Sequence, residues 1–519
     1  MQSPFFRRLW LVSIVANLCL WMNDVAAAWM MTSLTEAPLM VALVQTATTL
    51  PVFMLGLPSG ALADIVDRRR LFMITQFWVA GSATLLAFAV AMDAINPTLL
   101  LVLVFANGLG LAMRWPVYSA LVAELVPRPQ MPAAMALNGV AMNASRIFGP
   151  IIAGLLISAG GTAWVFTVNA LLSVVTGLTI LGWKRERKTS ALPGEQFLGA
   201  IRVGVQYVRQ SPRMLTVLVR TALFFGQAAS LVALLPLIAR SMPGASAHSY
   251  TLLLAAMGAG AIASAFLLPR WRTRFAHDEM IKRGTWGHGA ALLLAAVAPN
   301  MWLALPATFG AGLAFMAVAN TIAVAAQMSL PDWIRARGMS VYQMALMGGS
   351  ALGAAFWGQI ATITSVRFSL VLAALAGLGA LWLTRGRRLE DTPIEDHTPA
   401  RRFTSPIPAW SFDAASGPVL TTIEYQIDPA RADEFREVME RTRRRRLSRG
   451  LLSCELFRDS SDPGRFIEYM LDESWNEHLR RLERLTTVDE ELLEQRLRFH
   501  IGAEPPIMNR SIADDRHHR

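Results

Sequence analysis

The sequence has few charged residues. Asp, Glu, Lys and Arg make up 16% of its 519 residues, whereas about 25% is usual for soluble domains. Hydrophobic residues reach 54%, and the mean hydropathy is +0.39. This composition argues against a soluble globular protein and favours one that crosses a membrane several times.

Cysteine is also scarce. The two residues, Cys19 and Cys454, lie in an apolar run and in a polar C-terminal region, so we expect neither a disulfide nor a cysteine-rich metal site. The C-terminal region has no visible metal-ligand cluster, catalytic nucleophile set or nucleotide-binding loop. We therefore expect no catalytic residue, metal or cofactor. The net charge of +11 is explained by basic loops, so it does not indicate nucleic-acid binding.

Long apolar runs are abundant instead. A membrane-spanning helix needs about 20 mostly apolar residues, and we read residues 9–31 as an uncleaved first helix rather than a signal peptide. Twelve spans are predicted: 9–31, 38–62, 71–92, 97–121, 133–157, 163–183, 215–239, 249–268, 281–298, 301–327, 339–362 and 366–384.

Basic residues gather in alternate connections between these spans. If residues 5–8 are cytoplasmic, the cytoplasmic connections carry nearly all of the Lys and Arg found between spans. The opposite connections hold little charge. This asymmetry agrees with the positive-inside rule and predicts that both termini are cytoplasmic. The basic groups are Arg68–Arg70, Arg128, Lys184–Lys188, Arg270–Arg274, and Arg335 with Arg337.

The two halves of the apolar region repeat each other at a shift of 204 residues. The matched pairs include Gly56 with Gly260, Gly108 with Gly312, Pro127 with Pro331, Met135 with Met339, Gly149 with Gly353, and Gly154 with Gly358. A repeat of six spans in the same orientation predicts an all-α membrane protein with two parallel six-helix halves. We assign these halves to residues 1–190 and 215–388.

The segment 191–214 joins the halves. Phe197, Leu198, Ile201, Val205 and Val208 fall on one helical face of it. This pattern predicts an amphipathic connector helix along the inner membrane surface.

The region after the last span has a different composition. Residues 389–417 are polar and rich in proline, which indicates a flexible linker, and 418–513 are predicted to form a small cytoplasmic α+β domain. The expected elements are strands at 419–427, 451–459, 465–472 and 507–512, with helices at 429–446 and 475–500. That order, βαββαβ, is typical of a ferredoxin-like fold.

Asp24 in the first span and Arg146 in the fifth interrupt two of the longest apolar runs. A charge at bilayer depth costs roughly 3 kcal/mol or more, so it normally faces a partner or a wet cavity. Both residues are expected about 21–23 Å from the inner ends of their spans, which permits an ion pair. One interpretation is a structural salt bridge. The other is proton coupling, with Asp24 protonated in one access state and paired with Arg146 in the other.

Other polar residues could complete such a cavity. We include Asn23, Asn143 and Arg114 among the candidates for proton coupling or cavity lining. Arg114 is expected nearer the cytoplasm, so it could either line the cavity or extend to the lipid headgroups. His288 is expected to be a packed residue.

The connection after the second span resembles the major facilitator signature between the second and third helices. It reads Gly60, three residues, Asp64, and then a basic cluster with Arg68 and Arg69. The resemblance implies a cytoplasmic gate in which Asp64 caps a helix N-terminus. Ile65 and Asp67 depart from the family pattern.

The fifth span resembles the antiporter signature of major facilitator exporters. Its residues are Gly139, Arg146, Gly149, Pro150 and Gly154. Glycines permit close helix packing, and Pro150 leaves the carbonyl of Arg146 without its helical partner. A simple Gly- and Pro-containing packing helix is the alternative.

Together these motifs resemble the enterobactin-exporter-like, or transmembrane secretion effector, branch of the major facilitator superfamily. The resemblance implies export of a small amphipathic molecule, such as a siderophore, drug or metabolite. It also implies proton antiport and alternating access in a bacterial inner membrane.

The C-terminal segment with Glu473, Trp475 and His478 resembles antibiotic-biosynthesis-monooxygenase-like domains, which implies a possible homodimer. The alternative function is a monooxygenase-like or ligand-sensing domain tethered to a scaffold that transports poorly or not at all.

Overall fold

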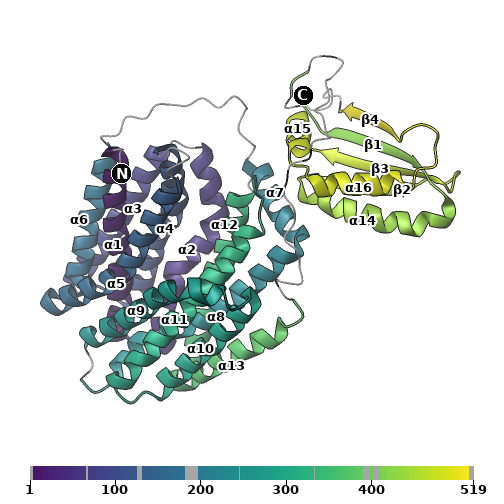
Figure 1. The fold of residues 1–519 in the computed structure, drawn as a ribbon. Helices are drawn as coiled ribbons and strands as arrows, with labels where there is room; N and C mark the ends of the chain where they lie inside the picture. Colours follow the sequence, from purple (N-terminus) through teal and green to yellow (C-terminus); the bar gives the residue numbers. More distant parts are fainter. Residues whose placement is uncertain are drawn as a thin grey trace. The chain divides into compact units, whose positions relative to one another are not determined.

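The structure, a computed structural model, describes residues 4–65, 68–125, 131–181, 197–244, 246–331, 333–387 and 416–513, with residues 389, 398, 400, 410 and 412–414. It divides into two compact units. The first comprises Met1–Pro193, Thr216–Gln327 and Met339–Asp391. The second comprises Gly194–Leu215, Met328–Gly338 and Thr392–Arg519. The ribbon in Figure 1 follows the chain through both.

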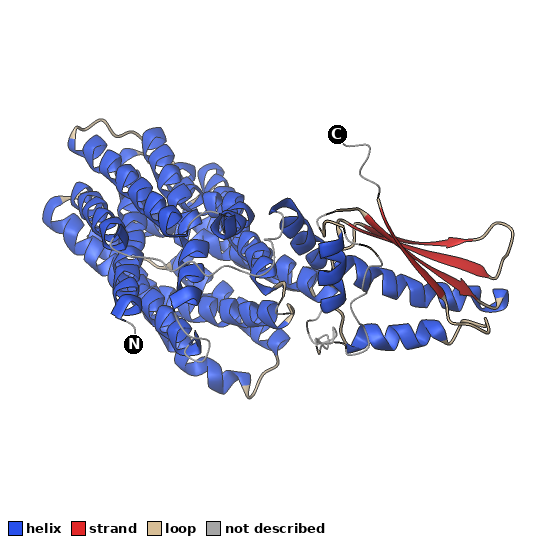
Figure 2. Ribbon diagram, turned by 90° about the horizontal axis from the view of Figure 1, so that it is seen from above, coloured by secondary structure: helices blue, strands red, loops and turns tan. Residues whose placement is uncertain are grey.

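The first unit is helical, as the apolar runs predict (Figures 1 and 2). In the described part of the chain, nine helices are long and apolar enough to cross a membrane. These nine are α1 (Pro4–Leu34), α2 (Pro38–Ile65), α3 (Arg68–Ala91), α4 (Pro97–Leu125), α6 (Thr162–Leu181), α8 (Pro212–Arg240), α9 (Ala247–Arg272), α11 (Met301–Met328) and α13 (Val366–Leu383).

Three further predicted spans also form helices but fall outside that set. They are α5 (Met131–Gly160), α10 (His277–Val297) and α12 (Arg335–Ile363). In α5 the apolar part is the shorter run Ala144–Gly160. The first turn of α10 carries Asp278 and Glu279. The prediction of twelve spans therefore remains a proposal.

The internal repeat recurs in the helix boundaries. Helices α4 and α11 begin at Pro97 and Met301, α5 and α12 at Met131 and Arg335, and α6 and α13 at Thr162 and Val366. The difference is 204 residues in each case, the shift found in the sequence. The 204-residue shift therefore holds for the start of the last three helices of each half, whereas the first three pairs start 208 or 209 residues apart.

Matched glycines also make matched packing contacts. A Cβ on Gly149 of α5 would lie 2.5 Å from Cβ of Trp21 in α1, and one on Gly353 of α12 would lie 2.1 Å from the carbonyl oxygen of Gly226 in α8. Only glycine allows helices to approach this closely. Each half therefore packs its first helix against its fifth in the same way.

The second unit contains a four-stranded antiparallel sheet in the order β2-β3-β1-β4. Helices α14 and α16 cover one face of it (Figures 1 and 2). The elements are β1 (Val419–Gln426), the 3-10 helix η2 (Pro429–Arg431), α14 (Ala432–Ser448), β2 (Ser453–Arg458), β3 (Arg465–Asp472), α15 (Trp475–Glu483), α16 (Thr487–Leu497) and β4 (Ile507–Ile512).

The predicted order of strands and helices is confirmed, with one correction. The helix expected at 475–500 is two helices, α15 and α16. The break occurs because Thr486 begins a new helix with a capping box, in which its side chain and that of Asp489 bond each other's backbone. Alternate residues of β1 and β3 are buried, and Tyr425, Phe435 and Phe466 form the centre of this core.

The connector forms helix α7 (Phe197–Gln210), but it packs against protein. Gln206 donates a 2.9 Å hydrogen bond to the carbonyl of Leu451, and Arg202 forms a 2.5 Å ion pair with Glu473. Val203 is buried, beside Gly450. These contacts come from Arg202, Val203 and Gln206, which are not among the residues of the predicted apolar face. The expectation that this face lies along the membrane surface stays a prediction.

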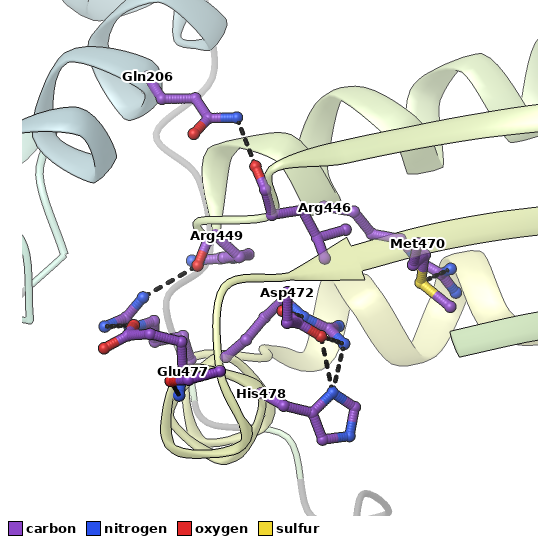
Figure 3. Close-up of polar contacts among 11 residues, drawn as sticks. Gln206, Arg446, Arg449, Met470, Asp472, Glu477 and His478 are labelled. Atoms are coloured by element: carbon purple, nitrogen blue, oxygen red, sulfur yellow. Dashed lines mark hydrogen bonds and ion pairs between the residues drawn. The ribbon is translucent and has the colours of Figure 1, made fainter. Parts of the chain in front are cut away.

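A third segment of this unit, the 328–338 connection between α11 and α12, also contacts the C-terminal domain. The guanidinium of Arg484 lies 4.6 Å from the ring centre of Trp333, and Tyr207 of α7 meets the same ring edge-on. Within the second unit, the C-terminal domain therefore contacts both α7 and the 328–338 connection. Figure 3 shows the Gln206 contact.

Candidate transport site

A cavity of about 50 Å³ lies in the first unit, between helices of both halves. Its walls include Asp24, Thr48, Arg146 and Pro150 from the first half and Tyr250 from the second. The volume is sufficient for a few water molecules but not for an organic substrate. Asp24 and Arg146 both line this cavity, and their role in proton coupling stays a prediction.

Asp24 has one close polar neighbour. The hydroxyl of Thr48 donates to Oδ1 of Asp24 at 3.5 Å, and it also donates to the carbonyl of Val44 at 3.1 Å. The Asp24 contact is at the limit of a hydrogen bond. The Asp24 carboxyl is therefore weakly held by this hydroxyl.

Arg146 interacts mainly with aromatic rings. Its guanidinium carbon lies 5.6 Å from the ring centre of Trp21 and 5.3 Å from that of Phe315. Among the described residues its Nε has no hydrogen-bond partner, and no ion pair joins it to Asp24. The cation–π contacts stabilise the charge partly. Because Phe315 belongs to α11, Arg146 links the two halves.

Arg114 and Asn23 contact other helices rather than the cavity. Arg114 is buried and donates to the carbonyl of Ala16 at 3.1 Å and to Oδ1 of Asn17 at 2.9 Å. Asn23 accepts a 3.2 Å hydrogen bond from Asn169. Of the two alternatives for Arg114, headgroup contact is thus excluded in this state. Both residues stabilise the packing of α1.

Several predicted residues lie outside what the structure describes at side-chain level. Gly60 and Asp64 fall within α2, and Arg68 begins α3, but their side chains are outside the described part. The same holds for Asn143 and Gly139 in α5. Arg69 is described and has an interaction partner. The gating motif remains a prediction.

The antiporter-like motif brings the halves together. A Cβ on Gly154 would lie 2.5 Å from Oγ1 of Thr251 in α9, and one on Gly358 of α12 would lie 2.4 Å from Cβ of Ala42 in α2. These glycines match at the 204-residue shift, and each contacts the opposite half. Pro150 lies inside α5, next to the cavity.

Further contacts join the two halves near the helix ends where Gly154 and Gly358 lie. Trp29 stacks on Tyr250 with ring centres 6.0 Å apart, and the backbone N–H of Leu39 donates to the hydroxyl of Thr362 at 3.0 Å. The charge pattern places these ends outside. The halves are therefore packed together at the end that we expect to face the exterior.

The sequence did not lead us to predict that Thr48 and Tyr250 line the cavity. Tyr250 is one of only six tyrosines in the chain and lies in a predicted span, so its rarity was an available signal. Thr48 had none, because a threonine in a membrane helix usually bonds its own backbone. His288 is packed as expected, against Phe224 and Phe315.

Comparison with known proteins gives consistent results. A family model described as "Transmembrane secretion effector" matches residues 1–518. An uncharacterized MFS-type transporter of Bacillus subtilis, YfiS, is 25% identical over 389 residues, covering 72% of this chain and 92% of that protein. The putative multidrug resistance protein MdtD of Escherichia coli is 29% identical over 178 residues, about a third of each chain.

Solved structures resemble the helical part in fold. A bacterial homolog of the human lysosomal transporter Spinster, in an inward-facing and unoccupied conformation, has a TM-score of 0.61 at 15% identity. It covers 76% of this chain and 99% of that one. The nucleoside transporter NupG (D323A mutant) gives 0.62 at 12% identity, with coverage of 74% and 99%. At these identities the likeness concerns the fold alone.

Proposed function

Because the chain belongs to the transmembrane secretion effector family of the major facilitator superfamily, we propose that it exports a small amphipathic molecule by proton antiport. Its family and structural neighbours are transporters and not enzymes. The monooxygenase alternative is therefore set aside. Relatives named for multidrug resistance support a drug-like substrate, and siderophores and metabolites remain within the proposed class.

The observation that carries the proposal is the cavity shared by Asp24 and Arg146. A carboxyl held by one weak hydrogen bond can be protonated from one side of the membrane and release its proton to the other. When it is ionised, the nearby Arg146 offers a counter-charge. Arg146 also contacts both halves, so a change in its pairing would affect their packing.

Alternating access follows from the two-half plan. We propose twelve spans with both termini in the cytoplasm of a bacterial cell, and a state that is closed at the outer ends by α5 against α9 and α12 against α2. Asp64 and the basic residues Arg68 and Arg69 would then form the cytoplasmic gate. The paired glycines Gly154 and Gly358 support this arrangement.

We further propose that the C-terminal domain is ferredoxin-like, which its strand order supports. Its open sheet face carries Phe457 and Ile507, which are 55% and 57% exposed. Apolar groups on an uncovered face support pairing with a second copy. The size of purified full-length protein, measured by light scattering in detergent, would test this.

Transport by purified protein in liposomes tests the main proposal. An imposed pH gradient should drive movement of at least one dye from a panel of amphipathic cations, anions and neutral compounds. Asp24→Asn should abolish the gradient-driven component while leaving insertion unchanged. Asp93→Asn is the matched control, since Asp93 is exposed and lies after α3. Undiminished gradient-driven transport by Asp24→Asn would remove Asp24 from the mechanism.

A further inference from the structure

A second cavity, of about 230 Å³, lies inside the C-terminal domain. Its floor is a cross-strand row formed by Met470, Thr421 and Arg510, which pair across β3, β1 and β4. Helices α14, α15 and α16 supply its charged wall. The residues of this wall are Arg446, His478, Arg481, Asp489 and Arg496.

Positive charge exceeds negative charge around this cavity. Asp472 accepts two hydrogen bonds from Arg481, at 2.8 and 3.0 Å, and contacts His478 at 2.7 Å. Figure 3 shows this cluster. Glu468 is shared by Arg446 at 2.5 Å and Arg496 at 3.4 Å.

The remaining carboxylate of the wall is also shared. Asp489 pairs with Arg445 at 3.2 Å and with Arg449 at 3.3 Å. Arg510 has no carboxylate partner in the described part of the domain. Asp472, Glu468 and Asp489 are therefore each shared by two basic groups. Arg510 is the lining arginine that pairs with none of these three carboxylates.

Several polar atoms of the lining are buried without a partner. Among the described residues these are Nε2 of His478, Oγ1 of Thr421 and Nε of Arg496. The three side chains are 1–4% exposed. Nδ1 of His478 contacts the Asp472 carboxylate at 2.7 Å, and Nε2 lies on the other edge of the ring. Buried polar atoms normally have partners, so such a set indicates a missing ligand.

The electrostatics agree with the geometry. Burial lowers the pKa of Arg496, and the neighbouring Arg446 lowers it further. Burial also lowers the pKa of Arg510, with a further contribution from Arg481. The charged form of the buried Arg496 is thus incompletely compensated, and a bound anion would relieve this.

We propose that this cavity is a binding site for a small organic anion. Arg496 and Arg510 bind its carboxylate or phosphate group, and the hydroxyl of Thr421 donates a further hydrogen bond. The apolar body of the ligand packs against Leu482, Leu485 and Leu492, which line the same space. The volume suits a ligand smaller than most drugs.

The site is connected to the segments that join the transporter helices. Asp489 accepts from Arg449, whose carbonyl accepts a 3.0 Å hydrogen bond from Arg484. Arg484 in turn lies over Trp333 in the connection between α11 and α12. A chain of contacts through Arg449 and Arg484 therefore joins Asp489 of the cavity wall to Trp333 in that connection.

Calorimetric titration of the full-length protein in detergent tests the proposal. The probes are benzoate and phenyl phosphate, each compared with a neutral counterpart, benzamide and phenol. We expect at least one anion to bind tenfold or more tightly than its counterpart. Arg496→Gln and Arg510→Gln should each weaken that binding about tenfold, as expected for loss of a charge-assisted hydrogen bond. No membrane gradient is involved, so the result is independent of transport.

Two controls make the outcome decisive. Arg498→Gln removes a positive charge just after α16 at an exposed position outside the cavity, and it should leave binding unchanged. Arg510 is exposed, so its variant should fold even if the buried Arg496 variant does not. The proposal is overturned if neither anion binds better than its neutral counterpart, or if Arg498→Gln weakens binding as much as Arg510→Gln.

Discussion

Replacing Gly154 with alanine tests how the two halves close on each other. An ideal Cβ at this position would lie 2.5 Å from Oγ1, 2.8 Å from Cγ2 and 3.0 Å from Cβ of Thr251. Rotation of the threonine side chain can move the first two atoms but not the third. Part of the overlap must therefore be relieved by separating α5 from α9. Overpacking of this kind costs about 1–3 kcal/mol.

If the contact forms only when the outer ends are closed, that cost falls on the closed state alone. The ratio of closed to open molecules should then decrease by about 5- to 150-fold. Spin labels at Glu36 and Thr364, exposed residues next to helix ends of opposite halves, would report this as a larger population of long distances. The distances are measured by pulsed electron–electron double resonance, in a variant whose own cysteines, Cys19 and Cys454, have been replaced.

Two variants control for unrelated effects. Thr251→Ala removes Oγ1 and Cγ2, so adding it to Gly154→Ala should partly restore the short distances. Gly81→Ala places its Cβ where nothing lies within 4 Å, and it should change nothing. A distance distribution for Gly154→Ala equal to that of the parent would refute the closing contact, as would a long-distance population that Thr251→Ala leaves unchanged.

Three further predictions concern the gate and the C-terminal domain. Asp64→Ala should shift molecules toward the inward-open state because a helix N-terminus loses its anionic partner; unchanged cysteine labelling of the cytoplasmic vestibule would count against this. Deleting Gly417–Arg519 should leave transport largely intact, since the helices of both halves are retained, and transport lost from a normally inserted protein would make the domain a coupling element. Burial raises the pKa of Asp472, but Arg481 and His478 outweigh burial and hold it below 3.8. Its contribution to stability is therefore full above pH 3.8 and lost as the pH falls through the lower folded pKa, so Asp472→Asn should lower the unfolding temperature at pH 7 by more than it does in strong acid.

The sequence predicted most of the fold because its patterns are local. Apolar runs and basic loops located the helices, and the 204-residue repeat anticipated the matched contacts of Gly149 and Gly353. The alternating pattern of β1 located a strand. The break at Thr486 was missed although Thr486 and Asp489 have the spacing of a capping box, because the apolar period continues through it.

The partner of α7 could not be predicted in the same way. An amphipathic face shows that something apolar covers a helix, but lipid and protein are equivalent in that respect. The contacts that α7 makes with the C-terminal domain, Arg202 with Glu473 and Gln206 with the Leu451 carbonyl, join residues about 250 positions apart in the chain. No local pattern carries that information.

The pairing of Asp24 with Arg146 shows a similar limit. Counting residues along a helix gives an expected depth in the membrane, and both residues line one cavity. It does not give the direction in which a long side chain points. Arg146 extends between Trp21 and Phe315, while Asp24 is held by Thr48. Since Nε of Arg146 has no partner among the described residues, an ionised Asp24 or an anionic group of a substrate would stabilise it. Protonation of Asp24 would remove one of these counter-charges, so we expect a change in the charge of Asp24 to alter the contacts that Arg146 makes with both halves.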